Sequence, residues 1–117
     1  MASKKKEKTE FGQYLVDEIE RAKISQTAFI EEVPMARPYF YNILTGTPPS
    51  QDVLEKIITA LNNHLPPDEN RRSTLIDKAA KCRGEIPPDI NRMILDHTEQ
   101  WDAIREMLSS LLSEPHK

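Results

Sequence analysis

Apolar residues recur at helical spacing along most of the chain. The first stripe consists of residues separated by four, four and three positions: Phe11, Leu15, Ile19 and Ala22. This spacing places them on one side of a helix, and Thr9 stands where an N-cap residue would accept a hydrogen bond from the first turn. Val, Ile and Thr never alternate with polar residues over the length of a strand. The pattern therefore predicts an all-α protein.

The segment VPMARPYFYNILTG, residues 33–46, has helical apolar spacing but carries two prolines in its first half. Pro34 inside a helix would lose a hydrogen bond and clash with the carbonyl four residues earlier. It also disfavours helical geometry in the residue before it. We therefore expect a second helix that is capped by Ser25 and ends near Glu32.

The second proline of this segment, Pro38, is compatible with a third helix. If Ala36 is the N-cap, Pro38 lies in the first turn, where backbone amides have no partner within the helix. This helix begins at Arg37 and runs to Gly46, where we expect a left-handed stop. The expected inward-facing residues are Phe40 and Ile43, and the expected outward-facing residues are Arg37, Tyr41, Asn42 and Thr45.

Further helices follow this pair. A fourth helix begins after Ser50, and a fifth is predicted from about Pro67 to Cys82, ended by Gly84. Beyond it we expect a short helix at 88–95 and a longer one at 98–112, separated by a break at which Asp96 or Thr98 caps the new helix. The residues of the fifth helix expected to pack on the preceding helices are Leu75, Ile76, Ala79, Ala80 and Cys82.

The last predicted helix carries an apolar stripe that is too extensive to remain in contact with water. Its main residues continue a heptad register and are the candidates for a dimer interface: Trp101, Ile104, Leu108 and Leu111. Two interpretations stay open, because the stripe can pack on its own domain or pair with a second subunit.

Charge is distributed unevenly along the 117 residues, whose net charge is −3. Residues 1–9 carry +3, residues 10–64 carry −4 and residues 65–117 carry −2. We interpret residues 1–9 as a flexible basic arm, which is either a solvated tail or a segment that contacts phosphates. The lysines concerned include Lys4, Lys5 and Lys6. The acidic residues of the first two helices are expected on an outward face: Glu18, Glu20, Glu31 and Glu32.

Motifs of catalysis and metal binding are missing from the sequence. The single cysteine, Cys82, excludes a disulfide within the chain, and its separation from His64 and His97 does not match metal-ligand spacing. No nucleophile elbow or glycine-rich phosphate loop occurs. We therefore expect no enzymatic activity, no metal and no cofactor. No apolar run approaches the roughly 20 residues that span a bilayer, and the basic N-terminus lacks an apolar stretch after it. We expect a cytoplasmic protein.

Two short helices joined by a tight turn have the dimensions of a helix-turn-helix. An ordered set of residues adds a resemblance to that geometry: Ser25, Gln26, Phe29, Met35, Arg37, Tyr39, Ile43, Gly46, Pro49, Ser50, Leu54, Ile57, Ile58 and Leu61. These residues lie in one segment, ISQTAFIEEVPMARPYFYNILTGTPPSQDVLEKIITAL. This segment resembles the helix-turn-helix domains of the Cro/CI (XRE) family. The resemblance covers about residues 10–64 and implies a five-helix lambda-repressor-like domain that binds DNA, followed by a C-terminal helical extension at 65–117.

The family resemblance also implies a set of contacts with double-stranded DNA. It implies that Gln26 contacts a phosphate, Arg37 reads a guanine and Asn42 reads an adenine. The residues that would face DNA are Gln26, Arg37, Pro38, Tyr41, Asn42, Thr45 and Thr47. The implied function is a sequence-specific transcriptional regulator, a repressor that binds a two-fold operator as a homodimer through a recognition helix at 36–45.

Two residues depart from the family pattern. Ile30 stands where the family has a small residue, and Pro34 stands where the family often has glycine. Proline is fixed near a φ of −65°, whereas glycine is free to adopt positive φ, so the turn is expected to differ from the usual one. These departures and the acidic body leave an alternative open. In that alternative the chain is a protein-interaction module or anti-repressor with the helix-turn-helix fold that does not read DNA.

Overall fold

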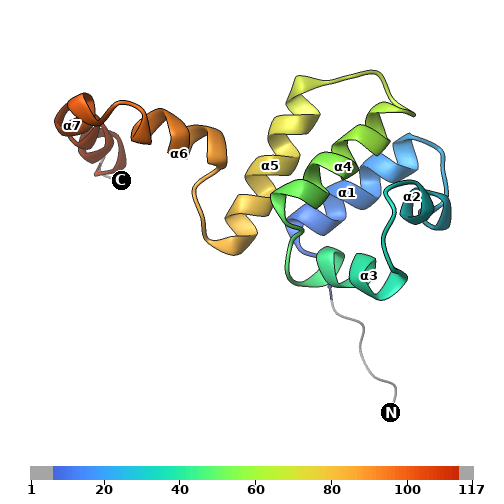
Figure 1. Ribbon diagram of the computed structural model, residues 1–117. Helices are drawn as coiled ribbons and strands as arrows, with labels where there is room; N and C mark the ends of the chain where they lie inside the picture. The colour runs from blue at the N-terminus through green and yellow to red at the C-terminus, as the bar shows by residue number, and fades with distance from the viewer. Residues whose placement is uncertain (1–6, 114–117) are drawn as a thin grey trace, which may run out of the picture. The chain divides into compact units, whose positions relative to one another are not determined.

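The computed structural model describes residues 7–113, and these form helices joined by turns and loops (Figure 1). The all-α prediction is thereby confirmed. The chain divides into two compact units, one ending at Glu85 and the other beginning at Ile86. The first unit holds α1 (Glu10–Arg21), α2 (Gln26–Glu32), α3 (Arg37–Thr45), α4 (Gln51–Asn62) and α5 (Glu69–Arg83). The second holds α6 (Pro88–Leu95), the 3₁₀ turn η1 (Thr98–Gln100) and α7 (Trp101–Leu112).

Local sequence signals account for the starts of the first three helices. The Thr9 hydroxyl accepts a hydrogen bond from the Gly12 amide at 3.0 Å, and the Ser25 hydroxyl accepts one from the Ala28 amide at 3.0 Å. Ala36 has extended geometry, so α3 begins at Arg37 with a proline in its first turn, as predicted. Helix α2 ends before Pro34, whose peptide bond with Val33 is cis.

Two helix ends differ from the sequence-based expectation. Gly46 ends α3 with a φ of −148°, so the expected left-handed stop is wrong there. Gly84, after α5, does adopt the left-handed conformation, with a φ of 71°. Neither Asp96 nor Thr98 caps the last helix, because η1 comes first and has no side-chain cap.

The core of the first unit is shared by all five of its helices. Helix α1 packs against both α3 and α5, and α4 also packs against α5. The rings of Phe29 and Phe40 join α2 to α3, with centroids 6.2 Å apart and planes tilted by 55°. The other apolar side chains that are almost fully buried in this core are Phe11, Leu15, Ile19, Ile43, Leu54, Ile57, Leu61, Leu75 and Ala79.

Helix α5 belongs to the first unit, although its residues fall in the 65–117 extension of the sequence-based division. Its predicted packing face is confirmed for Leu75, Ala79 and Ala80, which are buried, and Ile76 is half-buried. Cys82, expected on the same face, is exposed. The first unit therefore continues past residue 64 through α5.

A buried charged pair also ties α5 to α1. Glu18 was expected on an outward face, but its exposed fraction is only 4%. The Arg71 guanidinium from α5, itself 1% exposed, lies with its Nε atom 4.0 Å from the Glu18 carboxylate. Arg71 also donates to Asn62 Oδ1 at 2.6 Å and to the Pro66 carbonyl at 2.8 Å. The expectation for Glu18 is wrong, since its side chain is buried where α1 packs on α5.

Within residues 86–113, a hydrogen bond from a side chain connects α7 to α6. The Trp101 indole donates a hydrogen bond to the Ile94 carbonyl at 2.7 Å, and this contact spans η1. None of the described residues of this unit is buried. Its apolar side chains therefore remain in contact with solvent. Among residues 7–113, no helix is both long enough and apolar enough to cross a membrane.

Candidate nucleic-acid interface

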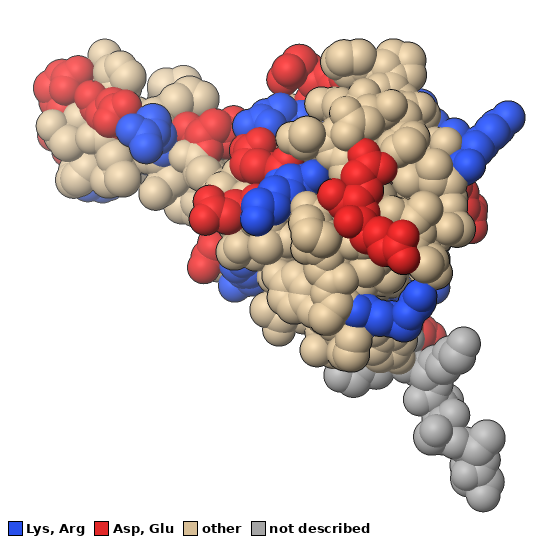
Figure 2. Space-filling model, turned by 45° about the vertical axis from the view of Figure 1, so that its right-hand side comes forward, with Lys and Arg blue, Asp and Glu red and all other residues tan. Residues whose placement is uncertain are grey.

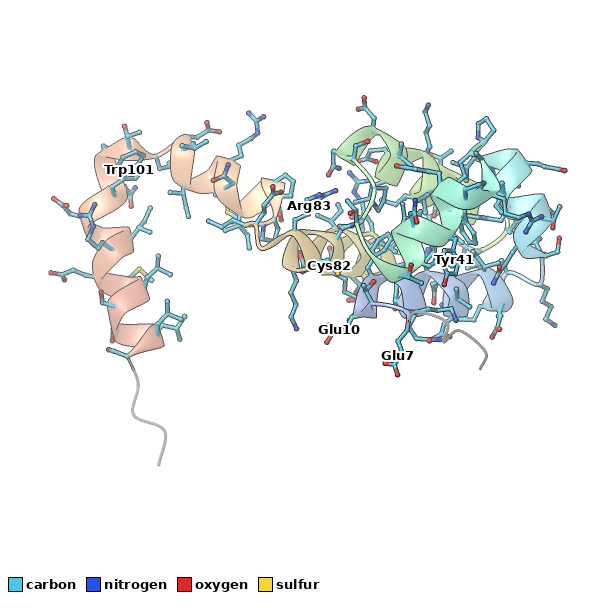
Figure 3. All side chains as sticks on the ribbon, turned by 90° about the horizontal axis from the view of Figure 1, so that it is seen from below. Glu7, Glu10, Tyr41, Cys82, Arg83 and Trp101 are labelled. Atoms are coloured by element: carbon cyan, nitrogen blue, oxygen red, sulfur yellow. The ribbon has the colours of Figure 1, made fainter. Side chains whose placement is uncertain are left out.

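Helix α3 has one buried side and one exposed side. Phe40, Ile43 and Leu44 are buried in the core of the first unit. Thr45 is half-buried. The remaining side chains of the helix are exposed: Arg37, Pro38, Tyr39, Tyr41 and Asn42. They include three that the sequence predicted to face outward, namely Arg37, Tyr41 and Asn42. Figure 3 shows Tyr41 on this helix in the view from below. The exposed side offers one cation together with phenol and amide groups.

The C-terminal end of α3 lies directly against the start of α1. The Thr9 amide donates to the Leu44 carbonyl at 2.9 Å. A Cβ atom on Gly12 would lie 2.0 Å from the same carbonyl oxygen, so only glycine permits this approach. Residue 9 is where the basic N-terminal arm joins the fold. Thr9, the last residue of the arm, therefore lies beside α3. Lys8 is exposed, and Lys4, Lys5 and Lys6 lie outside the described residues.

The N-terminal ends of α2 and α3 are held together by Arg37. Its Nη2 atom donates a hydrogen bond to the Thr27 hydroxyl at 2.8 Å. Among the described residues, no carboxylate lies within 4.0 Å of this guanidinium. Gln26, the first residue of α2 and the neighbour of Thr27, is also exposed. The structure therefore brings the elements that carry Gln26 and Arg37 to one edge, with further guanidinium donors available.

A groove of about 540 Å³ lies between the exposed side of α3, the following loop and the end of α5. Its polar lining comes from Tyr39, Asn42, Thr45, Thr47, Ser50 and Arg83. Asn42, Thr45 and Thr47 were candidate DNA contacts from sequence, so the structure brings these three together.

Arg83 is a residue that the sequence-based search did not select. One of its guanidinium nitrogens donates to the Pro49 carbonyl in the loop after α3. Figure 3 labels Arg83 near the end of α5, in the first unit. A basic residue just before the helix-ending Gly84 is a visible signal for a helix C-terminus. Nothing in the sequence relates it to a loop 34 residues earlier.

A second groove, of about 230 Å³ between α2 and α4, is acidic. It is lined in part by Glu32 and Glu55. Hydrogen bonds from Asn63 and His64 lower the pKa of Glu32, and those from Arg72 lower the pKa of Glu55. Both carboxylates stay ionised at neutral pH. Glu55 is paired with Arg72, and Lys56 also lines the groove, so Glu32 is the carboxylate of this groove that no Lys or Arg of the described residues neutralises.

The apolar stripe of the second unit forms an open hollow of about 680 Å³. Three of the four candidate dimer residues line it, namely Trp101, Ile104 and Leu108. Leu111 lies outside this lining and is 70% exposed. Ile94 and Leu95 from α6 and Leu112 from α7 complete the apolar wall.

Comparison of the chain with protein-family models, with curated proteins and with solved structures found no match to any of them.

Proposed function

We propose that the chain is a DNA-binding transcriptional regulator, acting as a repressor, whose recognition helix is α3. In this proposal α1–α5 form a five-helix domain of the lambda-repressor type. The observation that carries it is the environment of Arg37. This guanidinium stands at the exposed start of α3, is oriented by Thr27 and has no carboxylate within 4.0 Å among residues 7–113. A guanidinium in this position suits the O6 and N7 atoms of a guanine in the major groove.

The net charge of −4 on residues 10–64 opposes DNA binding less than the sequence alone suggests, because several of its carboxylates are paired in the structure. Glu18 is buried beside Arg71 and accepts hydrogen bonds from Arg21 at 2.8 Å. Glu55 forms a two-bond pair with Arg72 at 2.8 Å, and Glu10 lies 3.4 Å from Lys81. These carboxylates are therefore compensated locally. In Figure 2 the lower part of the first unit, where α3 lies, is mainly uncharged.

The arm and the α2 start add positive or hydrogen-bonding groups on either side of α3. The arm, which carries Lys4, Lys5 and Lys6, joins the fold at Thr9, beside the C-terminal end of α3. At the other end Gln26 opens α2, and helix N-termini bind phosphates through their unpaired amides. In this proposal both regions contact the DNA backbone, and α3 between them contacts the bases.

The test of α3 is replacement of Arg37 by alanine and by lysine. We expect Arg37→Ala to cost about 1–3 kcal/mol on a preferred duplex and to relax the preference at one guanine position. Arg37→Lys should not restore that preference, since an ammonium lacks the planar fork that matches guanine. The measurement is competition binding against single-base variants of a duplex selected from a random library, with thermal melts of each variant alongside.

Neighbouring residues provide matched controls for that experiment. Asn42→Ala should relax the preference at an adjacent position, more weakly. Gln26→Ala should weaken binding to every sequence equally, because a phosphate contact carries no base information. If Arg37→Ala binds every single-base variant as the parent does, α3 does not read DNA. If Arg37→Lys restores full preference, Arg37 acts only as a charge on the backbone.

We further propose that the regulator is a homodimer joined through the hollow of the second unit. None of residues 86–113 is buried, and units below about 40 residues rarely fold without a partner or a covalent or metal link. Two-fold pairing would also place two copies of α3 on a two-fold DNA site.

Charges placed in the hollow should break this dimer. We expect the double variant Ile104→Glu with Leu108→Glu to be a helical monomer, since two carboxylates would have to be desolvated at the interface. The matched control, Ala103→Glu with Ser110→Glu, adds the same charge to α7 outside the lining of the hollow and should stay dimeric. Light scattering measures the oligomeric state of the two double variants, and circular dichroism measures their helix content. A parent chain that is monomeric at about 50 µM, well above the Kd of a stable dimer, contradicts the proposal.

The acidic groove favours a second candidate function, a protein-interaction module or anti-repressor. Ionised Glu32 at this groove would suit a basic group of a partner protein. Selection from a random duplex library separates the two candidates. An enriched inverted repeat supports the regulator, whereas no enrichment together with recovery of a partner protein supports the module.

A further inference from the structure

We propose that the groove between α3, the α3–α4 loop and Arg83 binds a phosphate of the DNA backbone. This inference rests on the proposed function, because it assigns a contact on a duplex already held by α3. It adds a residue from α5, a helix outside the helix-turn-helix pair. The shared chemistry is that of a phosphate anion held by one guanidinium and several hydroxyl and amide groups.

The lining of the groove has the composition that an anion requires. Its polar groups are Tyr39, Asn42, Thr45, Thr47, Ser50 and Arg83, and no Asp or Glu is among the lining residues. The Thr45 hydroxyl already donates to the Tyr41 carbonyl at 3.0 Å. The donors that remain for a phosphate oxygen are the other three hydroxyls, the Asn42 amide and the Arg83 guanidinium. The groove between α2 and α4 differs in that Glu32 and Glu55 line it beside Lys56.

Arg83 is held in place by the fold. Its side chain is 25% exposed, and one guanidinium nitrogen donates to the Pro49 carbonyl of the loop. A second nitrogen lies 3.9 Å from the Glu85 carboxylate, which is 64% exposed. A contact at 3.9 Å is longer than a hydrogen bond and is screened by solvent. The guanidinium therefore keeps donors for a ligand while its position is fixed by the loop.

The place of the groove fits a backbone contact on one duplex. Asn42 belongs both to the exposed side of α3 and to the groove lining. A duplex whose bases meet α3 must carry a strand across the ends of that helix, and phosphate contacts set its register. With a volume of about 540 Å³ the groove can admit a phosphate with its sugar. Arg83 would then orient the duplex without reading its sequence.

The experiment measures duplex affinity against salt concentration for the parent and for Arg83→Gln. Because each phosphate contact contributes about 0.9 to the slope of log K against log salt, we expect the slope to fall by about that amount. Binding should weaken by the same factor for every single-base variant of the duplex. The matched control is Lys56→Gln, which removes the same charge from the acidic groove and should leave the slope unchanged.

A second variant separates the phosphate contact from the support that Arg83 gives to the loop. Glu85→Gln leaves the bond to Pro49 in place and removes the carboxylate beside the guanidinium, so it should tighten duplex binding severalfold. If neither Arg83→Gln nor Glu85→Gln changes affinity or slope, the groove holds no phosphate. In that case a preserved effect of Arg37→Ala leaves the proposed function intact. A parent that binds no duplex overturns both proposals.

Inorganic phosphate in solution is the alternative ligand, since it presents the same oxygen atoms as a phosphate of the DNA backbone. In a titration of the ¹⁵N-labelled parent with inorganic phosphate alone, we expect no saturable shift of the Gly46 and Thr47 amides below 10 mM, because a single anion lacks the rest of the backbone. Saturation below about 1 mM, an affinity above about 4 kcal/mol, would show a small-anion site and overturn the assignment to DNA.

Discussion

Glu18→Gln is expected to destabilise the first unit by about 3–5 kcal/mol, the usual cost of removing one partner of a buried ion pair. Glutamine has nearly the same shape as glutamate, so the substitution removes charge without opening a cavity. It leaves the Arg71 guanidinium, 1% exposed, without a carboxylate inside the core that joins α1 to α5. The measurement is the free energy of unfolding from a urea titration.

The same helix offers a matched control for this effect. Glu20 is exposed, and Glu20→Gln should change the free energy of unfolding by less than about 0.5 kcal/mol. Replacing both partners of the pair, with Glu18→Gln and Arg71→Met, should recover part of the loss because no buried charge remains. Equal unfolding midpoints for Glu18→Gln and Glu20→Gln would show that the buried pair does not stabilise the fold.

Gly12→Ala is expected to destabilise the first unit by about 3 kcal/mol, at the upper end of the usual cost of overpacking. The added Cβ would lie 2.0 Å from the Leu44 carbonyl oxygen and 2.7 Å from two further backbone atoms of that residue. Backbone atoms cannot rotate away, so α1 and α3 must separate. The gain in helix propensity, about 1 kcal/mol, offsets only part of this cost.

Separation of the two helices would also shift α3, so duplex binding should fall together with stability. Urea unfolding and duplex titration on the same sample measure both. Gln13→Ala, at the next residue and exposed, is the control and should leave both nearly unchanged. A Gly12→Ala variant as stable as the parent would mean that α1 and α3 can move apart without cost.

The local signals in the sequence predicted where most helices begin and end. Thr9 and Ser25 cap α1 and α2 because their hydroxyls accept bonds from amides only three residues later. Pro34 ends α2 and Pro38 opens α3 through constraints that act within one turn. Gly46 shows the limit of such signals. Its presence marked the end of α3, but its φ of −148° is not the left-handed value that the sequence signal predicted.

The sequence predicted which residues of α3 are exposed at the candidate interface, but not the contacts between α3 and other elements. Helical periodicity separated the exposed Arg37, Tyr41 and Asn42 from the buried face of α3, because that separation depends on spacing alone. The contact of Arg37 with Thr27 depends on how α2 and α3 cross, and the contact of Arg83 with Pro49 depends on where α5 ends. Neither of these two contacts has a signature in the sequence.

The sequence by itself determined an all-α chain, the bounds of most helices and the apolar faces of α5 and α7, since these follow from interactions between near neighbours. Only the tertiary structure decided that α5 completes the first unit, that Glu18 is buried against Arg71 and that Gly12 lies against Leu44. The Gly12–Leu44 contact joins residues 32 positions apart, and the contact between Lys81 of α5 and Glu10 of α1 joins residues 71 positions apart. A contact at such a separation depends on the mutual arrangement of whole helices, in which shape and charge must be compatible across several elements at once.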